Sequence, residues 1–184
     1  MSKNIKIHIF GASGSGVSTL GRTLADKLEI SFYDVDDYYW EKTDPPFINA
    51  RPLNKRQNLL KEAVFDRSSW VLSGSLVSWG DIIRDEFDWA FYLYTPKEIR
   101  LERLKKRERQ RFGSRIEVNG DMYEGHLKFL EWAAQYDEGR LSGRSKKKHE
   151  EWIKTLSCPI IQLDGSYSTE ILTSTIISLL IKTL

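Results

Sequence analysis

The chain has 184 residues, a formal net charge of +2 and one cysteine, Cys158, so it has room for one domain with a sizeable core and no internal disulfide. The near-neutral charge gives no electrostatic reason to expect nucleic acid as a partner. Because we find neither a stretch of signal-peptide form nor an apolar run long enough to cross a bilayer, we expect a cytoplasmic protein without membrane association.

A glycine-rich loop lies between a predicted strand and a predicted helix near the start of the chain. An apolar, β-branched run ends at Phe10, and leucines recur at helical spacing from Leu20 to Leu28. Between them the sequence GASGSGVST fits the pattern Gly-x-x-x-x-Gly-Lys-Ser/Thr except at the lysine. The loop predicts a phosphate site built from main-chain N–H groups and a helix N-terminus. The predicted contact residues are Gly11, Ala12, Ser13, Gly14, Ser15, Gly16, Val17, Ser18 and Thr19.

Two positions of this loop decide what chemistry to expect. Ser18 occupies the position of the hydroxyl that coordinates Mg²⁺, so it is a predicted metal ligand. Val17 replaces the lysine that binds the β- and γ-phosphates. Losing a charged hydrogen bond costs about 1.5–3 kcal/mol, or about one to two decades in affinity or rate. Three interpretations remain: an enzyme with a substitute cation, which we favour, a nucleotide-binding protein with little turnover, and a site for a phosphate other than a nucleotide.

Predicted strands and helices then alternate along the chain, as a parallel α/β sheet requires. Besides the strand before the loop, the predicted strands are Ile30–Tyr33, Trp70–Leu72, Trp89–Tyr94 and Pro159–Leu163. Besides the helix after the loop, the predicted helices lie around 59–64 and at 97–111, Tyr123–Tyr136, Lys146–Leu156 and Ile171–Leu184. This order predicts a P-loop NTPase-type, three-layer α/β/α fold with a five-stranded parallel sheet. We expect one domain over 1–184, with a helical lid or substrate insert at about 112–157.

Two aspartates follow the second predicted strand in the sequence DVDD. Ligands of such sheets bind at the C-terminal ends of the strands, and Asp34 and Asp36 would project to the same side of an extended chain. We predict that one of them, Asp34, holds the metal through water and that the other accepts a hydrogen bond from a substrate hydroxyl. The alternative is a turn that ends the strand, which is a common use of aspartate. Asp37 is expected to be solvated.

The predicted helix after Pro96 carries a stripe of arginines spaced four residues apart. The stripe consists of Arg103, Arg107 and Arg111. Guanidinium groups remain charged and bind phosphate bidentately, so the stripe would supply the missing positive charge. Arg100 lies close to it, and Arg115 follows in the next loop. The alternative is a solvated helix with ion pairs, and we expect a solvated face at Arg144 and Lys146–Lys148.

Four stretches of the chain resemble the adenylate kinase-like P-loop kinases, the group that holds nucleoside monophosphate and shikimate kinases. These stretches are FGASGSGVSTLGRTLADKL (10–28), FYDVDD (32–37), FYLYTPKEIRLERLKKRERQRFG (91–113) and IIQLDGS (160–166). The resemblance implies ATP and Mg²⁺ as cofactors and adenine contacts near Gly165. It also implies metal and substrate binding by Asp34 and Asp36, and closure of the lid arginines on the phosphates. The chain departs from this group at Val17 and at 70–75, where no acidic residue ends the third strand.

These observations predict an Mg-ATP-dependent phosphotransferase acting on a small metabolite, with a nucleoside or nucleotide as the first candidate. Its partners would be a nucleotide and a small-molecule acceptor, and it would act as a monomer or homodimer. The alternative is a nucleotide-binding regulatory protein that has lost phosphotransfer, as Val17 and the third strand suggest. A kinase that modifies nucleic acid is disfavoured by the near-neutral charge.

Overall fold

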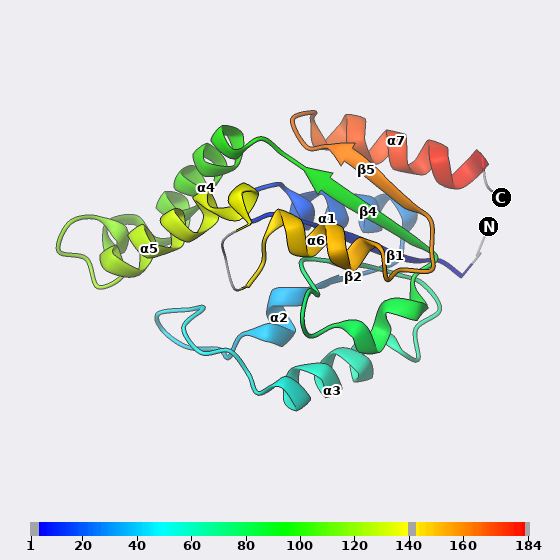
Figure 1. The fold of residues 1–184 in the computed structure, drawn as a ribbon, viewed down its shortest axis with the longest axis horizontal. Helices are drawn as coiled ribbons and strands as arrows, with labels where there is room; N and C mark the ends of the chain where they lie inside the picture. The colour runs from blue at the N-terminus through cyan, green and yellow to red at the C-terminus, as the bar shows by residue number, and fades with distance from the viewer. Residues whose placement is uncertain (1–3, 140–142, 183–184) are drawn as a thin grey trace.

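The computed structural model describes residues 4–139 and 143–182 (Figure 1). Five strands form one sheet with the order β2-β3-β1-β4-β5, in which every pairing is parallel. The strands are β1 (Lys6–Gly11), β2 (Ser31–Asp34), β3 (Trp70–Ser73), β4 (Trp89–Tyr94) and β5 (Ile160–Asp164). The C-terminal ends of β1 and β3 therefore lie side by side, with β2 next to β3, so the segments that follow these strands meet at one edge.

Helices cover both faces of this sheet. They are α1 (Val17–Leu28), α2 (Val35–Tyr39), α3 (Leu53–Val64), α4 (Lys97–Phe112), α5 (Tyr123–Ala134), α6 (Lys146–Ile153) and α7 (Thr169–Lys182). One apolar cluster joins α1 and α7 to the sheet, and a second cluster joins α3 and α6 to the opposite face. The predicted three-layer α/β fold with a five-stranded parallel sheet is confirmed.

The alternation of side chains along β1 assigns residues to the two faces. Ile7 and Ile9 are fully buried in the cluster with α1 and α7. Phe10 is buried in the other cluster, and His8 stacks on the ring of Phe10. A central strand that is apolar on both faces is typical of a sheet covered by helices on both sides.

Helices α4 and α5 extend beyond the sheet on the side where the strands end (Figure 1). The described residues also form three short 3-10 helices, η1 (Asp81–Glu86), η2 (Gly113–Ile116) and η3 (Tyr136–Glu138). Helix α6 returns to the sheet, where Trp152 is buried among Phe10, Phe87 and their neighbours. The residues predicted as an insert thus include a projecting part and a part that covers the sheet.

The structure differs from the predicted elements at several boundaries. Helix α2 and the 3-10 helix η1 were not predicted, because both are too short to show a period. The helix predicted at Tyr123–Tyr136 ends at Ala134, and the one predicted at Lys146–Leu156 ends at Ile153. Helix α7 begins at Thr169, two residues before the predicted start. Its predicted last residues, 183–184, lie outside the described residues.

His8 introduces a titratable group into the apolar layer between the sheet and α6. Its ring lies 4.7 Å from the ring of Phe87, and its Nδ1 donates a hydrogen bond to the carbonyl of Leu72 at 3.0 Å. Burial lowers the pKa of His8 from 6.5 to about 3, and burial similarly lowers the pKa of His149 to about 3. The folded protein therefore keeps both rings neutral at pH values where the unfolded chain binds protons.

Acidification is accordingly expected to destabilise the fold through these histidines. Each should lower the free energy of unfolding by about 1.4 kcal/mol per pH unit as the pH falls from 6.5 toward 3. His8→Phe should remove the contribution of His8, as measured by urea unfolding at pH 7, 6, 5 and 4. Ile9→Val is the control, since it should shift stability equally at every pH. Equal pH dependence in His8→Phe and the wild type would contradict the argument.

Candidate active site

A cleft of about 1330 Å³ lies at the C-terminal edge of the sheet. Its walls come from the glycine loop, the start of α2, the segments at 45–48 and 74–79, helices α4 and α5, and residues 143–144. The loop lines this cleft together with aromatic side chains from α2 and from 74–79. The cleft thus brings together segments that the sequence analysis associated with phosphate, metal and substrate.

The glycine loop turns sharply between β1 and α1. Gly14 and Gly16 have φ values of +80° and +101°, and a Cβ atom on Gly14 would lie 2.6 Å from the carbonyl oxygen of Arg100. Only glycine meets both requirements. The Ser15 hydroxyl donates to the carbonyl of Ala12 at 2.7 Å and closes the turn. Helix α1 begins immediately afterwards at Val17, so its first N–H groups have no carbonyl partner within the helix.

Val17 contributes no charge to this loop. Its side chain packs against the apolar cluster between the sheet and α1, and its carbonyl accepts a hydrogen bond from the hydroxyl of Ser73 at 3.1 Å. Ser73 ends β3 next to the loop, so the end of the third strand bears a hydroxyl in place of a carboxylate. Ser18 and Thr19, on the next positions of α1, are exposed and line the cleft.

All three arginines of the predicted stripe line the cleft, but they differ in their partners and exposure. Arg103 Nη1 donates to the carbonyls of Ser15 at 3.2 Å and Gly165 at 2.9 Å. Arg107 also lines the cleft, where it is paired with Glu108 at 2.9 Å, and Arg111 is exposed at the cleft wall. Arg103 thus links the loop to Gly165, the residue after β5 that we expect near adenine.

Two arginines near the stripe do not line the cleft. Arg100 is completely buried beneath the loop, because α4 begins against the end of the sheet. Arg115 pairs with Asp44 at 2.7 Å and with Asp121 at 2.6 Å, outside the glycine loop. Proximity in sequence to the stripe thus did not predict a place in the site.

Arg144 is a candidate site residue that the sequence analysis missed. It was expected on a solvated face, but its Nη1 donates to the hydroxyl of Ser13 at 3.2 Å. Its guanidinium carbon lies 5.9 Å from the centre of the Trp132 ring, and the residue lines the cleft. No local pattern marks it, because it precedes α6 and reaches the loop only through the tertiary fold.

The two predicted aspartates lie together, but the expected extended backbone was wrong. Asp34 ends β2, and its Oδ1 accepts a hydrogen bond from the main-chain N–H of Asp36 at 3.0 Å. Asp34 is therefore the N-cap of α2, and Asp36 lies in the first turn of this helix. The capping hydrogen bond bends the chain where a strand would continue. Both carboxylates still line the cleft.

Asp36 has the more perturbed titration of this pair. Desolvation within the cleft raises the pKa of its carboxyl group, the positive charge of Arg144 opposes this change, and the negative charge of Asp34 adds to it. The side chain remains open to the cleft. A carboxylate with a raised pKa next to a cation and an open cavity can accept a proton from a bound hydroxyl. Asp37 is exposed, as expected.

Aromatic side chains and one arginine form a second part of the cleft. The aromatic residues are Tyr39, Trp40, Phe47 and Trp79. The guanidinium carbon of Arg56 lies 4.4 Å from the centre of the Tyr39 ring and 5.4 Å from that of Trp79. Its Nε is buried and has no hydrogen-bond partner among the described residues. This part of the cleft thus offers flat apolar surfaces and a cation with unused donor capacity.

Ser18 and Asp34 are the residues that would hold a metal. Among the described residues, no three His, Cys, Asp or Glu side chains form a cluster able to bind a metal by themselves. Mg²⁺ is commonly held by one or two carboxylates, several waters and the phosphates of a substrate. A hydroxyl on α1 and a carboxylate at the end of β2, both open to the cleft, fit that mode of binding.

Comparison with known sequences assigns the chain to a family. The sequence model of the AAA domain matches residues 7–120. Since this match covers more than half of the chain, the protein belongs to the AAA domain family. It is similar to the uncharacterized protein YqaC of Bacillus subtilis, with 41% identity over 168 residues, across 91% of this chain and 92% of that protein. A shikimate kinase from Buchnera aphidicola is 31% identical over 122 residues, across 60% of this chain and 69% of its own.

Two solved structures share the fold. The shikimate kinase from Acinetobacter baumannii in complex with shikimate has a TM-score of 0.58 at 19% identity and covers 98% of this chain and 96% of its own. The deoxyadenosine kinase from M. mycoides with bound dATP has a TM-score of 0.57 at 17% identity, covering 96% of this chain and 99% of its own. The chain thus has the fold of P-loop kinases.

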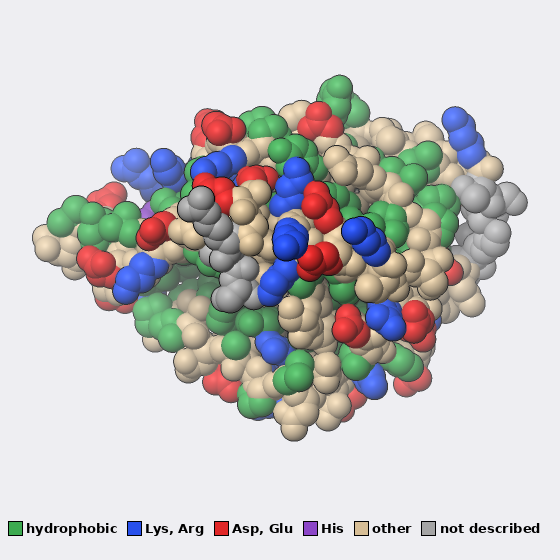
Figure 2. Space-filling model, viewed as in Figure 1, with side chains coloured by type: hydrophobic (Ala, Val, Ile, Leu, Met, Phe, Trp, Pro, Cys, Tyr) green, Lys and Arg blue, Asp and Glu red, His purple; other side chains and the backbone are tan. Residues whose placement is uncertain are grey.

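The charges on the face of the molecule seen in Figure 2 are mixed. Figure 2 shows Lys and Arg side chains interspersed with Asp and Glu on the face in view. A basic patch or stripe is the electrostatic signature of nucleic-acid binding, and the face in view shows mixed charges instead. The expectation that nucleic acid is not a partner stays a prediction. Within the described part of the chain, no helix has the length and hydrophobicity needed to span a membrane.

Proposed function

We propose that the protein is a phosphotransferase that uses Mg-ATP to phosphorylate a small metabolite. The observation that carries the proposal is the approach of Arg103 and Arg144 to the glycine loop in the cleft that also contains Asp36. Phosphoryl transfer requires mainly positioning and charge stabilisation. This arrangement offers an anion-binding loop, cations beside it and a carboxylate facing the same space.

Each predicted site residue then has a role. The N–H groups of 11–19 would hold the triphosphate, with Ser18 and Asp34 binding Mg²⁺ and Gly165 adjoining the adenine. Asp36 would orient the acceptor hydroxyl and take up its proton. Arg103, Arg107 and Arg111 would neutralise charge on the phosphates, and Mg²⁺ would contribute charge neutralisation between them. The residues at about 112–157 would act as a lid and substrate insert.

Arg144 is our candidate for the cation that replaces the missing lysine. It contacts Ser13 directly, and its charge acts on Asp36 across the cleft. A guanidinium at this place would face the loop and the acceptor at once. The chain would therefore belong to a branch of P-loop kinases in which the positive charge comes from the segment before α6 and not from the loop.

The aromatic part of the cleft would bind the acceptor. Flat rings with an adjacent guanidinium suit a molecule with a planar part and an anionic group. A nucleoside or nucleotide is our first candidate, and a shikimate-like acid is an alternative suggested by the relatives. We also propose that the protein acts as a monomer or homodimer.

A broad screen of acceptors with Mg-ATP tests this function. Nucleosides, nucleoside monophosphates, shikimate and gluconate should be compared by ADP formation, with ATP binding measured separately by calorimetry. At least one acceptor should stimulate ADP formation well above the rate without acceptor. ATP binding without stimulation by any acceptor would favour the second candidate, a nucleotide-binding regulatory protein, for which the uncharged Val17 is the supporting observation. Absence of binding would reject both.

Arg56→Gln should selectively weaken acceptor binding. Loss of a charged hydrogen bond to an anionic acceptor is expected to raise the KM for the acceptor about 10- to 100-fold. The KM for ATP should stay unchanged, because Arg56 lies in the aromatic part of the cleft. Lys55→Gln, on the exposed neighbouring position of α3, is the matched control. If both KM values rise equally, Arg56 does not act on the acceptor.

A further inference from the structure

The buried Arg100 connects the glycine loop to the end of α5 and to η3. Its side chain is fully inaccessible to solvent, and its guanidinium carbon lies 5.1 Å from the centre of the Tyr136 ring. A buried charge is costly unless it is paired and hydrogen-bonded. The partners of this guanidinium therefore show what its burial accomplishes.

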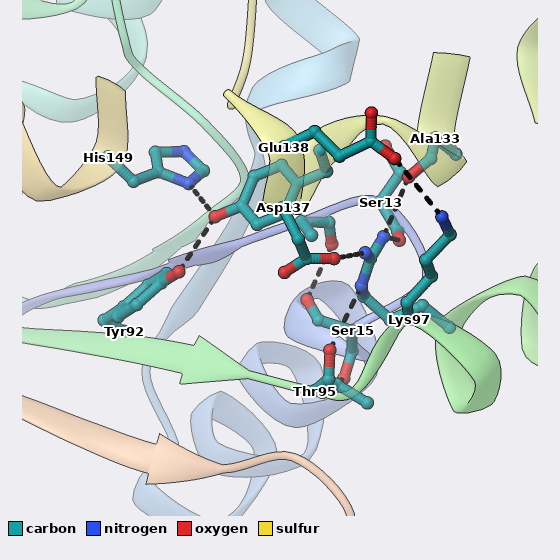
Figure 3. A network of polar contacts seen from close by, with 12 residues as sticks. Ser13, Ser15, Tyr92, Thr95, Lys97, Ala133, Asp137, Glu138 and His149 are labelled. Carbon is teal, nitrogen blue, oxygen red and sulfur yellow. Dashed lines mark hydrogen bonds and ion pairs between the residues drawn. The ribbon is translucent and has the colours of Figure 1, made fainter. Parts of the chain in front are cut away.

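Those partners come from four separate segments (Figure 3). Nε donates to the carbonyl of Thr95 at 3.1 Å, and Nη1 donates to the carbonyls of Ser13 at 3.4 Å and Ala133 at 3.1 Å. Nη2 forms an ion pair with Asp137 at 2.5 Å. One side chain thus ties the glycine loop and the start of α4 to the end of α5 and to η3.

The contact with Ser13 fixes the orientation of a peptide group in the part of the loop where we expect an anion to bind. In a planar trans peptide, the carbonyl of one residue and the N–H of the next point in opposite directions. A hydrogen bond that holds the Ser13 carbonyl toward Arg100 therefore directs the Gly14 N–H to the opposite side. The peptide group between Ser15 and Gly16 is held in the same way. The Ser15 carbonyl accepts hydrogen bonds from Thr95 Oγ1 at 3.2 Å and from Arg103.

We propose that Arg100 is a positioning residue that directs the Gly14 N–H toward the bound phosphate, and that its ion pair with Asp137 makes this orientation depend on the docked α5–η3 segment. The identity of the anion rests on the proposed function, whereas the orientation of the loop does not. Nucleotide affinity is thereby coupled to the docking of the α5–η3 segment. The coupling passes through Arg100, which pairs with Asp137 and donates to Ser13 of the loop.

Three variants separate this role from general stabilisation. Asp137→Asn removes the negative partner of Arg100. Arg100→Met combined with Asp137→Leu replaces the buried pair by apolar side chains, which often preserves stability. Glu138→Gln is the matched control, because Glu138 pairs with Lys97 at 3.7 Å on the exposed side of the same two segments.

The measurements are amide hydrogen exchange of peptides covering 11–19 and the kinetic constants for ATP and acceptor. In Asp137→Asn and in the double variant, exchange at the loop should accelerate, and the KM for ATP should rise about tenfold or more. The KM for the acceptor should stay unchanged. Glu138→Gln should match the wild type in every measurement.

Each outcome of these measurements either supports or overturns the positioning role of Arg100. Wild-type loop exchange in a folded double variant would overturn the proposal, even if Asp137→Asn fails to fold. A uniform rise of exchange over the whole chain would also overturn it, since that indicates a purely structural ion pair. If the wild type binds no ATP, the proposed function fails, while the exchange at 11–19 still tests the positioning role.

Discussion

Replacing Arg144 by methionine is expected to lower acceptor-stimulated ADP formation about 10³-fold, with a smaller effect on ATP affinity. Arginines that stabilise charge in phosphoryl transfer contribute on this scale. Arg144 donates to the hydroxyl of Ser13 in the loop, and its charge acts on Asp36, the proposed base. The measurement is kcat with saturating Mg-ATP and the best acceptor. Lys147→Met is the control, because this exposed residue of α6 forms a long ion pair with Glu151, at 4.0 Å.

A rescue experiment identifies the cause of the loss. If Arg144 replaces the cation of the loop, introducing Val17→Lys into the Arg144→Met variant should restore part of the lost kcat. Val17 is partly buried against the apolar cluster, so the lysine stem can occupy the same path while its charge extends into the cleft. Full activity in Arg144→Met alone would contradict this role for Arg144.

Asp36→Asn is the second change with a large expected effect. An amide of the same shape cannot take up the proton of the acceptor hydroxyl, so kcat should fall about 10²- to 10⁴-fold. Asp37→Asn, at the exposed next position, should change kcat little. The free energy of unfolding should be nearly unchanged in Asp36→Asn, because the hydrogen bond that caps α2 is accepted by Asp34. A fully active Asp36→Asn would exclude this residue as the base.

The pH dependence of the wild type provides a second measurement of the same role. The pKa of Asp36 is raised by desolvation, and only its ionised form can accept a proton. The kcat should therefore decline as the pH falls through this raised pKa. Asp36→Asn should lack this decline, whereas Asp37→Asn should retain it.

Local patterns were sufficient to predict the sheet and the glycine loop. The strands are apolar runs bounded by turns, and β4 has the same bounds in the sequence prediction and in the structure. Glycines at positive φ, such as Gly14 and Gly16, mark the loop because few other residues accept that backbone. These features depend on near neighbours in the chain, so a single sequence reveals them.

Long-range contacts were not predictable in this way. Arg144 acts on Ser13, 131 positions earlier in the chain, and nothing in its immediate neighbours distinguishes it from a solvated basic residue. Arg100 and Arg103 belong to the same helix, yet the first is buried and the second reaches the cleft. The difference arises from where α4 meets the sheet, which helical periodicity alone does not specify.

The aromatic lining of the cleft also gives the molecule an optical reporter. Three of the six tryptophans, Trp40, Trp79 and Trp132, line the cleft. Trp40 and Trp79 belong to the part that also contains Arg56, whereas Trp132 lies beside Arg144. Intrinsic fluorescence would thus report ligand binding in the cleft without an attached dye. Single Trp→Phe replacements would assign the emission change to the part of the cleft near Arg56 or to the part near Arg144.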